Sequence, residues 1–392
     1  MQSAYMTQQV ANVAVLGSTG SIGRNTLEVI AASGGSLRCV ALSAHASMDL
    51  LVEQAQHVQP RWIVAADPIA AASHDWSGLP LGVELLIGSE GLEAVATDAA
   101  VDIVVSAIVG SAGLLGTWAA VAAGKIVALA NKETMVVAGP LVNRLAQRTG
   151  ARIVPVDSEH SAVFQAMQAG RRDEVKRVIL TASGGPFRNH SLEQLAEVTI
   201  ADALRHPTWK MGPKITIDSA TMMNKALEII EARWLFDLAA DEIEVVVHPQ
   251  SIVHSLVEFV DGSVIAQLGS PDMKLPIQYA LTYPVRQPGV AARLDFTKTM
   301  RLDFEPPDPV RFPALGLGLE VARAGGTAGA VLNAANEAAV AKFRAGKLRF
   351  TDIVPSCRAI LEQHQFDPDP TLAQLQGLDA WARQEVMRWA CI

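Results

Sequence analysis

Short β-branched runs alternate with helix-length stretches throughout the first 156 residues. The runs are NVAVLG, LRCVALS, RWIVAA, VDIVVSAI, KIVALA and ARIVPV, which recur between residues 12 and 156. Such alternation is typical of parallel strands, because each parallel pair needs a long crossover, usually a helix. The pattern predicts an α/β fold whose N-terminal domain, residues 1–156, is a Rossmann-like doubly wound parallel sheet.

The first of these runs ends in the glycine-rich sequence GSTGSIG, and the helix-length stretch RNTLEVIAA follows it. Glycines permit a tight turn and let a pyrophosphate approach the backbone amides at a helix N-terminus. We therefore predict a dinucleotide site that includes Gly17, Gly20 and Gly23. The spacing is GxxGxxG rather than GxGxxG, and a glycine turn without a ligand is the alternative.

The next strand indicates which dinucleotide binds. NAD-binding proteins usually present Asp or Glu at its end, ~20 residues on, to hold the ribose hydroxyl. Here the strand ends in LSAHAS, residues 42–47. The missing carboxylate favours the 2'-phosphate form, yet neither Arg nor Lys is present to bind it. His45 is the remaining candidate, with weak support from Ser43 and Ser47.

The chain changes character after residue 156. Residues 157–284 mix strands and helices and include the hairpin SIVHSLVEF, Asp-Gly, SVIAQLG, which predicts a central α+β catalytic domain. Residues 285–314 are rich in proline and charge and are expected to form an extended linker. Residues 315–392 carry helical apolar spacing, which predicts a C-terminal helical bundle.

Composition disfavours several classes of protein. A net charge of -8 opposes binding to nucleic acids or anionic membranes. The stretch from Ile103 to Gly124 carries no charge and is long enough to span a bilayer, but glycines divide it into a strand, a turn and a helix. No basic residue precedes Arg24, so we expect no secretory signal peptide. Three widely spaced cysteines indicate neither a disulfide framework nor a zinc cluster, and we expect a cytoplasmic protein.

Two carboxylates follow the run ARIVPV. In an extended segment Asp157 and Glu159 point to one side, at a carboxyl strand end where open α/β sheets bind ligands. Two adjacent negative charges are costly unless a cation lies between them, and oxygen ligands suit Mg²⁺ or Mn²⁺. Solvated loop acids are the alternative interpretation.

A third candidate ligand lies in the predicted helix TMMNKALEIIEARWLF. Asn224, Glu228 and Glu231 share one stripe of this helix, whose start we expect Asp218 or Ser219 to cap. Beside the two carboxylates, Glu228 becomes a candidate metal ligand. An exposed amphipathic helix with ordinary surface charges is the alternative.

Two further segments offer groups that bind phosphate. The sequence TASGGP supplies the Ser183 hydroxyl and free amides, and Ser219, Asn224 and Lys225 add donors. These residues predict a phosphate site, although turn and cap chemistry explains each of them separately. Lys132 also follows a strand, where its charge can stabilise an anionic intermediate.

The sequence HPTWKMG, residues 206–212, lies between these segments. Its aromatic residue and glycine predict a flap that closes over substrate. A structural loop that packs Trp209 into the core is an equally good interpretation.

Six motifs together closely resemble the 1-deoxy-D-xylulose 5-phosphate reductoisomerase family, the second enzyme of the methylerythritol phosphate route to isoprenoids. They are GSTGSIGRNTL, ALANKET, PVDSEHSA, LTASGGPFR, HPTWKMGPKITIDSATMMNKALEIIEARWLF and HPQSIVHSLVEF. The resemblance implies an NADPH-dependent oxidoreductase that uses Mg²⁺, Mn²⁺ or Co²⁺. Such an enzyme rearranges and reduces 1-deoxy-D-xylulose 5-phosphate to 2-C-methyl-D-erythritol 4-phosphate. A homodimer is likewise implied.

The resemblance also implies roles for individual residues. The implied metal ligands are Asp157, Glu159 and Glu228. The implied phosphate ligands are Ser183, Ser219, Asn224 and Lys225, and the substrate pocket is completed by Lys132, Ser158 and His206. The implied NADPH contacts are Thr19, Gly20, Ser21, Ile22, Asn131, Glu133 and Gly212. Glu159 and Glu231 are the candidates for proton handling, with Lys132 and His206 as further catalytic candidates.

Two residues depart from the family pattern. Ala46 stands where family members usually place Lys or Arg against the 2'-phosphate, and Lys210 replaces a small polar residue of the flap. Two other functions fit the same motifs. One is a metal-assisted sugar-phosphate dehydrogenase without rearrangement, and the other is a non-catalytic nucleotide sensor.

Overall fold

The computed structural model describes residues 10–209 and 211–389. The described chain forms two compact units, one of residues 10–131, 145–156 and 273–291 and one of residues 132–144, 157–209, 211–272 and 292–389. The functional domains expected at 1–156, 157–284, 285–314 and 315–392 divide the chain differently and stay a prediction. Residues 1–9 and 390–392 of those domains lie outside the described ranges.

A seven-stranded sheet organises the first unit. Its strands are β1 (Ala11–Leu16), β2 (Leu37–Ala44), β3 (Trp62–Ala65), β4 (Glu84–Ile87), β5 (Ile103–Ser106), β6 (Ile126–Leu129) and β7 (Arg152–Pro155). The order is β4-β3-β2-β1-β5-β6-β7, and every pair is parallel. The strand order reverses between β1 and β5, which is where such sheets bind nucleotides. The predicted doubly wound sheet is confirmed.

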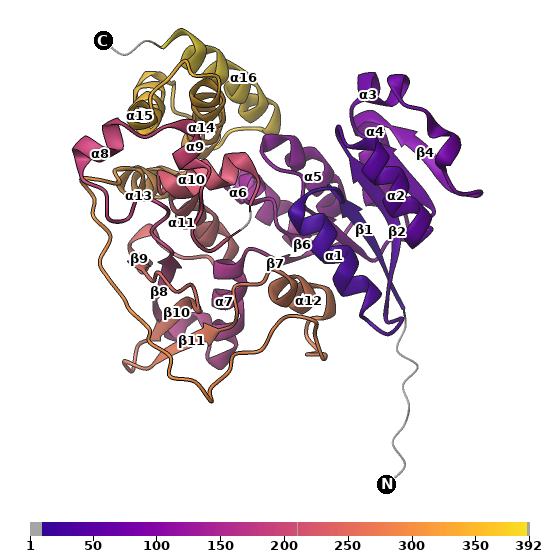
Figure 1. Cartoon of the computed structure of the whole chain (residues 1–392), viewed down its shortest axis with the longest axis horizontal. Helices are drawn as coiled ribbons and strands as arrows, with labels where there is room; N and C mark the ends of the chain where they lie inside the picture. Colours follow the sequence, from indigo (N-terminus) through magenta and orange to yellow (C-terminus); the bar gives the residue numbers. More distant parts are fainter. Residues whose placement is uncertain (1–9, 210, 390–392) are drawn as a thin grey trace. The chain divides into compact units, whose positions relative to one another are not determined.

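Helices cover both faces of this sheet (Figure 1). They are α1 (Ser21–Ala31), α2 (Met48–Val58), α3 (Pro68–Ser73), α4 (Gly88–Thr97), α5 (Leu114–Ala122), part of α6 (Lys132–Thr149) and α12 (Lys274–Thr282). Right-handed crossovers place α1 and α2 on the face opposite α4 and α5. α12 contacts α1 as well as β6 and β7, so a distant segment covers the part of the sheet that crossover helices leave open.

The glycine turn between β1 and α1 is shaped by two of its three glycines. Gly17 has φ +89°, and a Cβ there would lie 2.8 Å from the carbonyl of Ala107. A Cβ on Gly23 would lie 2.4 Å from the Gly17 carbonyl oxygen, whereas the nearest atom to one on Gly20 is 3.5 Å away. The Gly17 amide donates to Ser43 Oγ at 2.9 Å. Ser43 is buried by this contact, so its suggested role at the 2'-phosphate is wrong.

A four-stranded sheet organises the second unit. Its strands are β8 (Val175–Ala182), β9 (Ile243–Val247), β10 (Val253–Phe259) and β11 (Val264–Leu268), in the order β11-β10-β8-β9. β10 and β11 form the predicted antiparallel hairpin, and Gly262 in its turn has φ +86°. The helix α7 (Ser158–Ala166) packs on β10 and β11.

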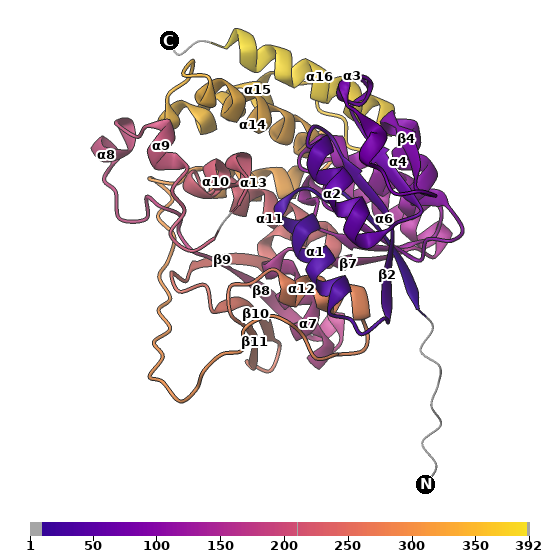
Figure 2. The same cartoon turned by 45° about the vertical axis from the view of Figure 1, so that its right-hand side comes forward.

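Helices build the rest of the second unit in two layers beyond the sheet. They are α8 (Leu192–Ala196), α9 (Ile200–Ala203), α10 (Pro213–Ala220), α11 (Met223–Leu235), α13 (Ala314–Ala324), α14 (Ala328–Arg344), α15 (Ile353–Gln363) and α16 (Leu372–Arg388). Figures 1 and 2 show α14, α15 and α16 together beyond α10, α11 and α13. One apolar cluster joins Val178 of β8, Leu227 of α11 and Val331 of α14. The predicted C-terminal helical bundle is confirmed.

Three further expectations can be compared with the structure. Asp218 and Ser219 do not cap α11, because both lie inside α10 and α11 begins after Met222, whose φ is +61°. Within the described chain, residues 283–313 contain no helix or strand beyond an isolated bridge at Glu305. The uncharged stretch 103–124 folds as β5, a turn and α5. No helix among the described residues has the length and apolar character needed to cross a membrane.

We expect Gly23→Ala to lower the free energy of unfolding by at least about 2 kcal/mol, because overpacking against backbone atoms cannot be relieved by a side-chain movement. Urea denaturation measures this change. Gly20→Ala is the matched control, since a Cβ there meets ordinary contact distances and ordinary φ. Equal stability of the two variants would contradict the assignment of Gly23 to backbone packing.

Candidate active site

Four carboxylates gather on α7 and α11. Asp157 is the N-cap residue of α7 and Glu159 lies in its first turn, while Glu228 and Glu231 lie on α11. The expectation that residues 157–159 are extended is wrong, because the helix begins at Ser158. Asp157 and Glu159 still lie together, at the N-terminus of a helix, which favours negative charge. Oxygens of Asp157, Glu159 and Glu228 lie within 4.8 Å of one another.

Two lysines lie among these acids. Lys132 Nζ is 2.7 Å from Asp157 Oδ2 and 3.2 Å from Glu228 Oε1. Lys225 Nζ is 3.1 Å from Glu159 Oε1 and also pairs with Glu228. Lys132 donates to Asn224 Oδ1 at 2.9 Å, so Asn224 belongs to the same group. We call the residues Lys132, Asp157, Glu159, Asn224, Lys225, Glu228 and Glu231 the acid–lysine cluster.

The acid–lysine cluster has two more carboxylates than ammonium groups, and burial makes this imbalance costly. Burial raises the pKa of Glu159 to about 8 and raises that of Glu231 well above its ordinary value. Burial also opposes ionisation of Asp157, but the neighbouring Lys132 outweighs it and lowers the pKa of Asp157. When all six groups are ionised, the cluster carries a net charge of two negative units, which a divalent cation neutralises. Carboxylate oxygens are also the ligands that Mg²⁺ and Mn²⁺ prefer. The residues therefore fit a divalent metal.

Glu228 and Glu231 are not surface charges, because only about 1% of each side chain is exposed. The interpretation of their helix as an exposed amphipathic one is therefore wrong. Glu231 Oε2 lies 3.5 Å from His160 Nδ1, and His160 Nε2 lies 3.0 Å from the backbone carbonyl of Glu228. His160 was not among the residues predicted for the site. Its position three residues after Asp157 on a helix was the available signal.

A second group of candidates lies around the loop after β8. Ser183 Oγ is 3.1 Å from His206 Nε2 and accepts from the Gly185 amide at 3.2 Å. The amides of Thr208 and Trp209 donate to His206 Nδ1, so Nε2 carries the proton of the neutral ring. Burial lowers the pKa of His206 to about 4, which keeps the ring neutral.

Ser219 lies beside this loop, because a Cβ on Gly185 would be 2.7 Å from the Ser219 carbonyl oxygen. The structure therefore places the Ser219 backbone beside the loop that carries Ser183, whose hydroxyl contacts His206. Trp209 is half-buried, and its ring centroid is 6.3 Å from that of His254. Lys210, the departure noted in the flap, lies outside the described residues.

The candidate cofactor residues fall in both units. Gly20 and Ser21 are exposed and Thr19 and Ile22 are half-buried in the glycine turn, while His45 and Ala46 are exposed after β2. Asn131 donates to the carbonyls of Ile108 and Gly110, so its amide orders the loop after β5. In the second unit, Gly212 is the N-cap residue of α10 and Glu133 pairs with Lys214.

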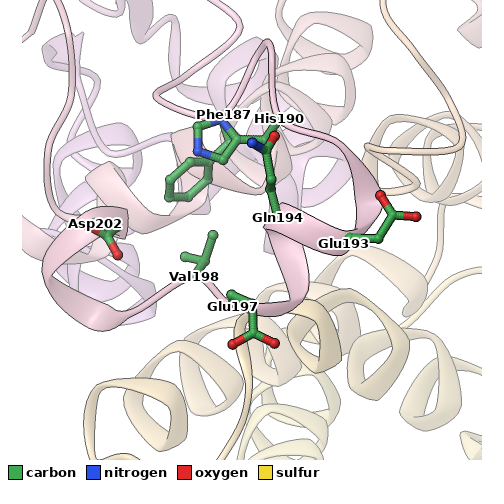
Figure 3. A pocket seen from close by; sticks show the side chains of 7 residues that line it. All are labelled: Phe187, His190, Glu193, Gln194, Glu197, Val198 and Asp202. Atoms are coloured by element: carbon green, nitrogen blue, oxygen red, sulfur yellow. The ribbon is translucent and has the colours of Figure 1, made fainter.

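A pocket of about 470 Å³ lies away from these residues. Figure 3 shows its lining side chains around α8 and α9: Phe187, His190, Glu193, Gln194, Glu197, Val198 and Asp202. None of the predicted site residues lines it. The acidic lining also makes it a poor site for a phosphorylated substrate.

A nucleotide-binding sheet in one unit and a buried cluster suited to a divalent cation in the other define a metal-dependent oxidoreductase of the dinucleotide-binding type. The family models of 1-deoxy-D-xylulose 5-phosphate reductoisomerase match residues 13–139, and those of its C-terminal domains match residues 153–236 and 268–385. The chain belongs to the 1-deoxy-D-xylulose 5-phosphate reductoisomerase family. The resemblance drawn from the sequence motifs is confirmed.

Individual relatives match over almost their full length. The reductoisomerase of Heliobacterium modesticaldum is 53% identical, with 96% of this chain and 96% of the relative covered. That of Rhodopirellula baltica is 50% identical, with 98% and 96% covered. A crystal structure of DOX-P reductoisomerase in complex with NADPH, fosmidomycin and magnesium gives a TM-score of 0.91 at 42% identity, covering 97% of this chain and 98% of the other. The Zymomonas mobilis enzyme in complex with NADPH gives 0.89 at 43%, covering 97% and 99%.

The raised pKa of Glu159 predicts that metal affinity depends on pH. Below pH 8 the metal must displace a proton from Glu159, so affinity is lost as pH falls and regained as pH rises to about 8. We expect the apparent dissociation constant for Mn²⁺ to fall by up to about tenfold from pH 6.5 to 7.5 and to level off above pH 8. Calorimetric titration measures it. A constant affinity over this range would contradict the assignment, and Glu159→Gln should bind weakly without the slope.

Proposed function

We propose that the acid–lysine cluster is the place where this enzyme rearranges its substrate. As a member of its family, the chain is an NADPH-dependent and divalent-metal-dependent oxidoreductase that converts 1-deoxy-D-xylulose 5-phosphate to 2-C-methyl-D-erythritol 4-phosphate, a step toward isoprenoid precursors. The observation that carries the proposal is the approach of three carboxylates within 4.8 Å beside two buried lysines.

Asp157, Glu159 and Glu228 would hold the cation. When bound, such a cation supplies Lewis acidity that stabilises negative charge developing on the oxygens of a ketose. Lys132 lies against two of these three carboxylates, so its ammonium group faces the same position. We assign Lys132 the role of orienting the substrate oxygens and stabilising their charge.

Glu159 and Glu231 are the proposed proton carriers. Without a cation, burial raises the pKa of Glu159 to about 8, so a bound cation would displace the proton of this carboxyl group, and Ser158 Oγ donates to its Oε2 at 2.5 Å. Glu231 is buried against His160 and holds its proton more firmly, because burial disfavours its charged form. We assign proton transfer to Glu159, which lies beside the position of the cation, and its support to Glu231.

Ser183, Ser219 and His206 form the proposed phosphate end of the substrate site. The hydroxyls and the neutral His206 ring can donate hydrogen bonds to a phosphate. Asn224 and Lys225 complete the proposed set. In the structure these two side chains contact Glu228, so they lie at the cation end and would have to reach toward the phosphate. The flap at residues 206–212 stays a prediction.

The glycine turn is the proposed NADPH site. Exposed backbone around Gly20 at the start of α1 suits the approach of a pyrophosphate. The proposed contacts are Gly17, Thr19, Gly20, Ser21, Ile22, Gly23, His45, Asn131, Glu133 and Gly212. Bound NADPH supplies the hydride that reduces the rearranged aldehyde. The structures of relatives in complex with NADPH support this assignment.

The two alternative functions are not favoured. A sugar-phosphate dehydrogenase without rearrangement and a nucleotide sensor share the glycine turn, but family membership supports neither. We further propose a homodimer on the basis of the family resemblance and a cytoplasmic location on the basis of the cysteine pattern, and sedimentation analysis tests the dimer. The direct test of function is metal-dependent oxidation of NADPH on addition of 1-deoxy-D-xylulose 5-phosphate, with the product identified by NMR. Absence of turnover while NADPH binds would contradict the function.

Glu228→Gln should lower turnover by more than about 100-fold, because loss of an outer-shell partner alone typically costs 10- to 100-fold in metal affinity or activity. Turnover and Mn²⁺ affinity are measured together, and NADPH fluorescence should show unchanged cofactor binding. Glu258→Gln is the matched control, since Glu258 is also a buried, ion-paired glutamate, held by Lys176 and Arg177 on the sheet. Full activity in a folded Glu228→Gln protein would remove this residue from the metal site.

Ala46→Arg should lower the KM for NADPH by about tenfold and leave that for NADH unchanged, because a guanidinium group binds the 2'-phosphate with charge-assisted hydrogen bonds. Steady-state kinetics with both cofactors measure the ratio. Ala46→Gln, which has similar reach without the charge, should change neither value by much. Parallel shifts for NADPH and NADH would show that residue 46 does not face the 2'-phosphate.

A further inference from the structure

A chain of buried polar contacts is centred on Lys214 of α10. Lys214 Nζ is 2.8 Å from Glu133 Oε1 and 3.0 Å from Asp218 Oδ2. Asn336 Nδ2 donates to Asp218 Oδ1 at 2.8 Å. Only 16% of the Lys214 side chain is exposed, and the two carboxylates are more deeply buried. The ammonium group therefore holds two carboxylates from different helices in fixed positions.

Each of these carboxylates is next to a residue of the proposed site. Glu133 follows Lys132 at the start of α6, and Asp218 precedes Ser219 near the end of α10. Lys132 belongs to the cation end of the substrate site and Ser219 to its phosphate end. Lys214 therefore connects the backbone segments that carry the two ends.

The helix α14 contacts both of the helices that Lys214 connects, α10 and α6. Asn336 of α14 anchors Asp218, and α14 also approaches α6 closely. A Cβ on Gly329 would lie 2.0 Å from the carbonyl oxygen of Val136. Close backbone packing leaves α6 and α14 little freedom to shift. The contact of Lys214 with Glu133 joins α10 directly to α6 and opposes movement of one relative to the other.

We infer that Lys214 is a positioning residue that fixes the separation between Lys132 and Ser219, and with it the distance between the cation end and the phosphate end of the substrate site. This inference rests on the proposed function. Among the described residues Lys214 contacts Glu133 and Asp218 rather than the acid–lysine cluster, so it acts through its neighbours. A substrate bound at both ends reacts efficiently only when both are held at the correct separation.

Stability alone does not account for a charged residue at this position. Apolar side chains of similar volume often replace a buried ion pair without loss of stability. What an ammonium group between two carboxylates adds is a defined geometry, because each contact must be kept at hydrogen-bond length to offset desolvation. Lys214 then contributes to activity by setting the distance between the cation end and the phosphate end of the substrate site. Kinetics and spectroscopy can test this contribution.

The test compares Lys214→Gln, Lys214→Arg and the control Lys342→Gln in the full-length enzyme. Lys342 is also partly buried, and it joins α14 to the end of α16 through the carbonyls of Val386 and Trp389. We expect kcat for 1-deoxy-D-xylulose 5-phosphate to fall by about 100-fold in Lys214→Gln, the cost of a displacement of roughly 1 Å. Separate affinities for Mn²⁺ and for inorganic phosphate should stay unchanged. Lys214→Arg should recover most of the loss, because its two-pronged donor group can bridge two carboxylates.

A distance measurement tests the same inference without turnover. Paramagnetic relaxation of ³¹P in inorganic phosphate bound to the Mn²⁺-loaded enzyme reports the metal-to-phosphorus distance, which should change in Lys214→Gln and return in Lys214→Arg. If Lys214→Gln does not fold, Asn336→Ala weakens the same connection without removing a charge and should alter the distance in the same direction.

Three results would overturn the inference: an unchanged distance, a kcat in Lys214→Gln close to that of the unmodified enzyme, or an equal loss of kcat in Lys342→Gln. An unmodified enzyme that does not turn over the substrate would contradict the proposed function, and the distance measurement would still decide the role of Lys214.

Discussion

The balance of charge inside the second unit is the constraint on which the site depends. Four carboxylates and two lysines are removed from water on α6, α7 and α11, where unpaired charge is expensive. No arrangement of these six groups alone is both fully ionised and neutral. The cluster therefore either keeps protons or binds a cation, and these two states are coupled through the carboxylate of Glu159. The same buried carboxyl groups therefore take part in metal binding and in proton transfer.

The fold supplies this costly arrangement from segments far apart in the chain. Lys132 follows β6, Asp157 follows β7, and Glu228 lies on a helix whose apolar residues belong to the core of the second unit. Parallel strands that end at one edge bring the first two segments together, and the packing of α11 brings the third. The large apolar core thus offsets the desolvation of the acids. A surface loop lacks the packing needed to hold so many like charges together.

Sequence patterns were sufficient where the chemistry is local. Hydrophobic alternation predicted the doubly wound sheet, the hairpin of β10 and β11, and the C-terminal helices, and the spacing of Asn224 and Glu228 predicted a shared helix stripe. The patterns failed where tertiary packing determines where a helix begins and ends. Residues 157–159 were expected to be extended, and Asp218 was expected to cap α11 although it lies within α10. Helical spacing could indicate that His160 lies near Asp157 and that Lys214 lies near Asp218. It could not indicate that His160 also contacts Glu231 or that Lys214 also contacts Glu133, because those partners lie on other helices.

The position of α12 has a consequence for the order in which the protein forms. This helix covers β6 and β7, yet it is encoded more than a hundred residues after those strands. A ribosome adds roughly 5 to 20 residues each second, so the nascent nucleotide-binding sheet waits for seconds with part of one apolar face uncovered. During synthesis the first unit cannot be completed before much of the second has emerged. The two units are separate in their cores but interdependent in their biogenesis.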